Sequence, residues 1–253
     1  MVSIKDIFQD LVSFAVPLNI NVIRVKSDKN TLFEGHDEGK RVIMKATTNE
    51  PVDGLDKNFG MSNLKILRGY LDTFKKLANT EELAKKLKID IALNSKNKDV
   101  PTDVVFNLSG QASANYRLMS YDNAPAQPTM TQQIQYDIEV KQPSRNKIQE
   151  FSSFAGILSE VEKNFSVKVI NKQLKFFIGD ENSSNSKVEF VFADDVQAKL
   201  TSALYWECHH FLAIMNLADS ADTTIKISNV GLIQIIVNTG LLTYEFLLPG
   251  SNS

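Results

Sequence analysis

The sequence predicts an α+β fold in which antiparallel sheets carry helices on one face. Three observations support this prediction: short strand-like runs that alternate apolar and polar residues, a few amphipathic segments, and a coarse repeat of about 120 residues. The strand-like runs are too short and too regularly alternating for parallel βαβ units, whose strands are buried on both faces. We therefore expect two similar domains with antiparallel sheets within the 253 residues.

The first half of the chain begins with a predicted helix. Ser3 and Asp6 form the S-x-x-D pattern of a helix N-terminus, and the helix must end before Pro17. A second helix is predicted over 60–77, with a charged helical extension over 79–90. Strands are expected at 20–27, 30–35, 41–48, 89–96, 103–110 and 114–122.

A proline-containing segment separates the two halves. Residues 123–131, NAPAQPTMT, contain little that could pack in a core. We therefore assign residues 1–122 to a first domain, 123–132 to a connecting linker and 133–253 to a second domain.

The second half repeats this order of elements. Pro143 and Ser144 open a helix that runs to Leu158, and another helix is predicted over 204–218. Strands are expected at 134–142, 165–171, 174–179, 188–195, 224–228, 232–238 and 241–248.

The predicted helix over 60–77 is the clearest candidate for a functional surface. When each residue is placed about 100° around the helix axis from the one before it, four cations and Asp72 share one face. This face is about 100° wide and lies opposite an apolar face. The cations are Lys65, Arg68, Lys75 and Lys76. This arc is either a solvated surface stripe or a face that meets a polyanion.

Charge is distributed unevenly along the chain although the formal net charge is only -2. Residues 1–130 contain 18 Lys and Arg against 16 Asp and Glu, whereas the remainder contains 10 against 14. A modest net charge does not exclude a nucleic-acid partner, because the local face decides such binding. Uncharged Gln149, Ser152 and Ser153 beside Arg145 and Lys147 suit loose phosphate contact and not base recognition.

The sequence offers no converging catalytic set, so we expect neither enzyme activity nor a metal or other cofactor. It lacks a Gly-rich phosphate loop and the G-x-S-x-G and H-E-x-x-H motifs. Cys208, His209 and His210 are adjacent, and adjacent helical residues diverge by about 100°, so they cannot close one metal site. One cysteine, no signal peptide and no membrane-spanning run predict a soluble, cytoplasmic protein.

Four stretches resemble the DNA sliding clamps, which include proliferating cell nuclear antigen and the clamps of T-even-like bacteriophages. Each stretch alone is a weak signal, and the order and spacing of the four make the resemblance specific. The stretches are FGMSNLKILRGYLDTF (59–74), VKQPSRNKIQEFSSFAGIL (140–158), LTSALYWECHHFLAIMNLA (200–218) and IKISNVGLIQIIVNTGLLTYEFLLPG (225–250).

This resemblance implies a homotrimeric ring that encircles duplex DNA without sequence specificity. Each domain would contain βαβββ twice, with helices lining the hole, sheets outside and edge strands paired between subunits. The clamp would tether the replicative polymerase, would be placed on DNA by a clamp loader, and would act in the host cytoplasm if viral. A β-rich viral structural or assembly protein, with a merely solvated basic helix, is the alternative.

The resemblance also implies site residues by position. The DNA-facing residues would be Lys65, Arg68, Lys75, Lys76, Arg145, Lys147 and His209. A pocket for partner peptides would be formed by Met119, Tyr121, Leu247, Leu248 and Pro249, although strand core is an equal interpretation of the two leucines. The last helix departs from a basic clamp, because it offers His and Asn where Lys or Arg would be expected.

Overall fold

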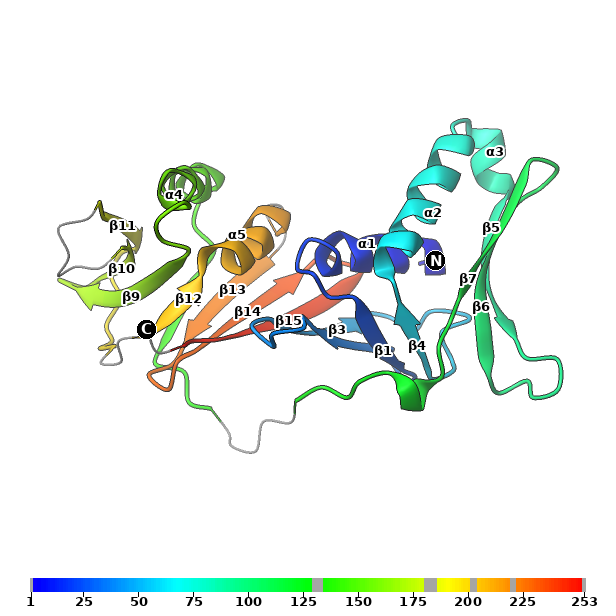
Figure 1. Cartoon of the computed structure of the whole chain (residues 1–253), viewed down its shortest axis with the longest axis horizontal. Coiled ribbons are helices and arrows are strands. Elements are labelled where there is room, and N and C mark those ends of the chain that lie inside the picture. The colour runs from blue at the N-terminus through cyan, green and yellow to red at the C-terminus, as the bar shows by residue number, and fades with distance from the viewer. Residues whose placement is uncertain (1, 129–133, 180–185, 201–203, 219–221, 252–253) are drawn as a thin grey trace. The chain divides into compact units, whose positions relative to one another are not determined.

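The protein is an α+β structure whose strands pair in antiparallel ladders (Figure 1), which confirms the predicted fold class. The computed structural model describes residues 2–128, 134–179, 186–200, 204–218 and 222–251. The contacts divide the chain into two units. The first contains Met1–Glu38, Met44–Pro128 and Gly240–Tyr244, and the second contains Gly39–Ile43, Thr129–Thr239 and Glu245–Ser253.

The first unit contains strands in the order β4-β1-β2-β3 and a separate three-stranded sheet with order β5-β6-β7. Helices α1 and α2 contact each other, and α2 also contacts β6 and β7. The elements are α1 (Ile4–Ala15), β1 (Val22–Lys26), β2 (Leu32–His36), β3 (Ile43–Thr48), β4 (Phe59–Ser62), α2 (Leu64–Leu77), α3 (Glu81–Lys86), β5 (Leu87–Leu93), β6 (Pro101–Leu108), β7 (Ala112–Arg117) and the short 3-10 helix η1 (Tyr121–Asn123).

The second unit contains strands in the order β15-β14-β13-β8 and a four-stranded sheet with order β11-β10-β9-β12. Helices α4 and α5 contact each other. The elements are β8 (Ile138–Lys141), α4 (Arg145–Leu158), β9 (Asn164–Ile170), β10 (Gln173–Ile178), β11 (Val188–Ala193), β12 (Tyr205–Glu207), α5 (Cys208–Leu217), β13 (Asp222–Ile227), β14 (Leu232–Asn238) and β15 (Leu242–Pro249).

A βαβββ order recurs along the chain, as the clamp resemblance implied. It is complete in β4-α2-β5-β6-β7, where α3 is inserted, and in β8-α4-β9-β10-β11 and β12-α5-β13-β14-β15. The first copy, α1-β1-β2-β3, has no strand among the described residues before α1.

Local sequence signals fix the two helix starts that they predicted. Ser3 and Asp6 form a reciprocal capping box, in which the Ser3 hydroxyl accepts from the Asp6 amide. The Ser144 hydroxyl likewise accepts from the Lys147 amide at the start of α4. These contacts satisfy amides that have no partner within the helix.

Three predicted helical segments were too long. Gly60–Ser62 belong to β4, where Gly60 pairs with Arg24, so α2 begins only at Leu64. Residues 205–207 form β12, which pairs with β9 ahead of α5. The charged segment over 79–90 is helical only in α3 and then enters β5. In each case hydrogen bonds to a distant strand override the local helical pattern.

Part of the predicted linker over 123–132 lies outside the described residues, because residues 129–133 are not described. In the described part, Ala124 is buried and the Gln127 side-chain amide donates to the Met44 carbonyl. Residues 124–127 are therefore held against the first unit by at least one side chain and one hydrogen bond.

Aromatic side chains fill the core beneath a helix in each unit. In the first unit, Phe106 of β6 is fully buried and lies 5.3 Å from the Phe74 ring and 5.6 Å from the Tyr70 ring of α2. In the second unit, the rings of Phe176 and Phe192 stack at 4.3 Å, and Phe151 of α4 packs edge-on against Phe176. Such ring contacts add to the free energy of area burial.

We expect Phe106→Ala to destabilise the protein by about 3–5 kcal/mol, because the substitution leaves a cavity beneath α2. Ile66→Ala is the matched control, since Ile66 lies on α2 but its side chain is 50% exposed. The control should cost less than about 1 kcal/mol. Denaturant-induced unfolding at one protein concentration measures both values. Equal losses would show that Phe106 does not anchor α2.

Candidate functional site

The basic stripe of α2, defined as Lys65, Arg68, Lys75 and Lys76, faces solvent. Leu64, Leu67, Leu71 and Phe74 bury the opposite face of the helix, and all four stripe cations are exposed. Arg68 lies 3.8 Å from the Asp72 carboxylate, an exposed pair that contributes little to stability. Among the described residues, no ion pair involves Lys65, Lys75 or Lys76. The stripe therefore keeps most of its positive charge available.

The predicted cations of the second unit form a much weaker surface. Arg145 is the first residue of α4 and is exposed. The Lys147 ammonium lies 4.0 Å from the Asp194 carboxylate, which offsets its charge. His209 is exposed on α5. The structure thus places three predicted residues on the helices of the second unit and four on α2 of the first.

The predicted peptide pocket divides between the two units. Met119 exchanges backbone hydrogen bonds with Gly60 in the first unit, at 2.9 and 3.0 Å. Tyr121 lies in the same unit, where the Arg24 guanidinium sits 3.9 Å from its ring centre. Leu247, Leu248 and Pro249 belong to the second unit. Each of the first two residues therefore has a packing role within its own unit.

The C-terminal residues of β15 lie beside two features of the second unit. Leu247 is buried in an apolar cluster with Ile43 and Leu232, against which Ile134 and Tyr136 pack while partly buried. The Leu248 carbonyl accepts a 3.1 Å hydrogen bond from the Trp206 indole. Pro249 is exposed and lines a neighbouring cavity.

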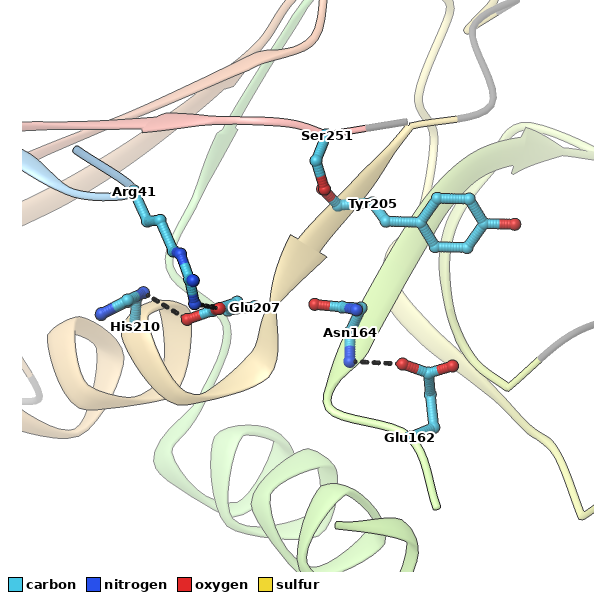
Figure 2. Close-up of polar contacts among 7 residues, drawn as sticks. All are labelled: Arg41, Glu162, Asn164, Tyr205, Glu207, His210 and Ser251. Atoms are coloured by element: carbon cyan, nitrogen blue, oxygen red, sulfur yellow. Dashed lines mark hydrogen bonds and ion pairs between the residues drawn. The ribbon is translucent and has the colours of Figure 1, made fainter. Parts of the chain in front are cut away.

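This cavity, of about 330 Å³, was not anticipated from the sequence. Figure 2 shows its polar side, where Arg41 and His210 both approach the Glu207 carboxylate. The Arg41 guanidinium pairs with one Glu207 oxygen, and His210 Nδ1 lies 3.0 Å from the other. Arg41 and Glu207 are separated by 166 positions in the sequence, and no local pattern relates them. Only the pairing of distant strands could have revealed the site.

The adjacent Cys208, His209 and His210 have different surroundings at the start of α5. Cys208 is buried, and burial raises the pKa of its thiol to about 12, so the thiol is not an activated nucleophile. His210 is buried against Glu207, whereas His209 points to solvent. No cluster of three potential metal ligands occurs in the described part of the chain. No helix in that part is long and apolar enough to cross a membrane.

Solved structures share the fold of this chain over nearly their whole length. The chain superposes on A. fulgidus PCNA bound to the C-terminal region of FEN-1, with a TM-score of 0.70, 8% identity and coverage of 99% of this chain and 97% of that chain. It also superposes on PCNA from Thermococcus kodakaraensis, with a TM-score of 0.66, 11% identity and coverage of 98% and 97%.

A third structure gives the same result. The PCNA2-PCNA3 complex from Sulfolobus tokodaii matches with a TM-score of 0.63, 11% identity and coverage of 98% of this chain and 97% of that chain. The chain has the PCNA-like sliding-clamp fold. This confirms the fold implied by the four sequence stretches. No family model and no characterised protein sequence in the comparisons matches the chain.

Proposed function

We propose that the protein is a DNA sliding clamp whose chains form a homotrimeric ring around duplex DNA and tether a polymerase. The basic stripe of α2, on a chain with the PCNA-like fold, is the observation that carries this proposal.

The proposed contact with DNA is a loose phosphate contact. Lys65, Lys75 and Lys76 are flexible point charges on an exposed helix face, without a fixed fork for a base edge. Phosphate contacts are independent of sequence and weaken with salt. Such contacts suit a clamp that slides, because a closed ring is retained by topology. The first unit supplies most of the charge, and Arg145, Lys147 and His209 supplement it.

Ring closure is supported by two strands that end their sheets in the described part of the chain. β7 ends one sheet of the first unit and contacts α2, while β11 ends one sheet of the second unit and contacts α4. An edge strand offers free backbone groups to another chain. Pairing β7 of one copy with β11 of the next joins two different surfaces. Such a head-to-tail contact produces a closed ring when the rotation between neighbouring subunits brings the last copy back to the first.

Exposed apolar residues near the end of α4 also favour a covering partner. Ile157 and Val161 are each 74% exposed, and Phe154 is 39% exposed while its ring lies 6.5 Å from that of Phe190 in β11. These residues lie at and just beyond the C-terminal part of α4. A second copy that pairs with β11 would remove their apolar surface from water.

Partner binding is proposed for the β15 region of the second unit. The A. fulgidus PCNA structure was solved with the C-terminal region of FEN-1 bound. By analogy, we propose that Leu247, Leu248 and Pro249 take peptides of a polymerase or a clamp loader. The resemblance to phage clamps further suggests a bacteriophage source and action in the host cytoplasm.

We expect Ile157→Asp to convert the ring to smaller species, because it places a charge in the proposed subunit contact. Val230→Asp is the control, since Val230 is also 74% exposed but lies in the turn between β13 and β14. Light scattering after gel filtration should give three times the 28.3 kDa chain mass for wild type and control. A wild-type protein that is monomeric at micromolar concentration would contradict the homotrimer.

We expect Lys65→Gln with Lys76→Gln to weaken binding to short duplex DNA and to lower its salt dependence. Each lost phosphate contact reduces the slope of log K against log salt by about 0.9. Lys85→Gln with Lys86→Gln removes the same charge from α3, where each lysine already pairs with a glutamate.

The control pair should therefore bind DNA nearly as the wild type does in the same titration. If the two double variants lose affinity and slope equally, the stripe is only a solvated surface. That result would favour a structural or assembly role for this fold.

A further inference from the structure

The cavity bounded by Arg41, Glu207 and His210 has the features of a binding site that the DNA-facing surface does not use. We call it the Arg41 site. Trp206, Leu248 and Pro249 contribute its apolar lining, and Asn164, Tyr205 and Ser251 contribute further polar groups. Its volume of about 330 Å³ admits one or two amino-acid side chains and is too small for a nucleic-acid duplex.

The hydrogen-bonding groups of the Arg41 site favour a ligand that brings acceptors. Arg41 pairs with one carboxylate oxygen of Glu207, and His210 Nδ1 lies 3.0 Å from the other. Arg41 has five N–H groups, and its side chain remains 62% exposed despite the ion pair. Glu207 therefore contacts the guanidinium. The remaining donors of Arg41, which have no hydrogen-bond partner in the described part of the chain, can bind a carboxylate bidentately.

The surroundings of the site favour a peptide over a phosphate group. Pro249 lines the cavity, and Leu247, two residues earlier in β15, belongs to the apolar cluster with Ile43 and Leu232. Side chains two positions apart in a strand lie on one face, about 7 Å from each other. A carboxylate and an apolar side chain at similar spacing on an extended peptide would match these two features, whereas a phosphate backbone would leave the apolar cluster unused.

We propose that the Arg41 site binds a carboxylate of an extended partner peptide whose apolar residue lies on the Ile43, Leu232 and Leu247 cluster. The carboxylate comes from an Asp or Glu side chain or from the peptide's C-terminus. This inference rests on the proposed docking of partner proteins, and it adds that an acidic group distinguishes the peptides that bind this clamp.

A random-sequence peptide library, displayed once with free C-termini and once with blocked C-termini, tests the proposal against the full-length protein. Wild-type protein should enrich peptides with a carboxylate at a fixed spacing from an apolar residue. Enrichment of acidic side chains in both libraries identifies the side chain as the source. Enrichment confined to free C-termini identifies the terminal carboxylate.

Synthetic copies of the enriched peptides should bind Arg41→Gln about tenfold more weakly, as expected for loss of a charge-assisted contact. Lys40→Gln, which removes the neighbouring exposed cation, should bind as the wild type does. Amidation of the carboxylate in the peptide should cause the same loss on wild-type protein. This second measurement keeps the test independent of how well the Arg41 variant folds.

Several results would overturn the proposal: no enrichment, enrichment without a carboxylate, or equal binding of the acidic and amidated peptides. None of these would change the mass of the ring or its binding to DNA. Conversely, a monomeric protein that still selects acidic peptides through Arg41 would contradict the proposed ring and leave the Arg41 site intact.

Discussion

The packing of α2 on β6 determines which way the basic stripe faces. Phe74 and Tyr70 lie against Phe106, and Leu67 and Leu71 are buried on the same side of the helix. A helix anchored by one apolar face has no freedom to rotate, so its opposite face must meet solvent or a partner. The direction of the cations is thus set by hydrophobic burial, and electrostatics acts only on the surface that burial leaves open.

The modest net charge is compatible with a DNA-encircling role because the charge is segregated. Lys65, Lys75 and Lys76 lie on one helix face, whereas the paired lysines of α3 are balanced by glutamates. A clamp must hold DNA without fixing it at one position. In the proposed clamp, the cations of α2, with weaker support from α4 and α5, would provide attraction that salt can screen, and the ring would provide retention.

The sequence predicted those features that depend on neighbouring residues. Helical periodicity identified the buried face of α2, and the Ser3 and Ser144 caps located two helix starts. Prediction from the sequence failed where distant segments pair. Gly60 pairs with β1, and Tyr205 and Trp206 pair with β9, although all three were assigned to helices. The Arg41 site was missed for the same reason, since its ion pair joins a turn before β3 to the residue that precedes α5.

Encirclement of DNA is tested most directly by adding the protein to a linear duplex either before or after both duplex ends are blocked. A ring threads onto free ends, so protein mixed with duplex before bulky end blocks are added should remain bound at about 0.5 M salt, where phosphate contacts are screened. Protein added after the blocks should be washed away. Equal retention in both orders would contradict a ring around DNA.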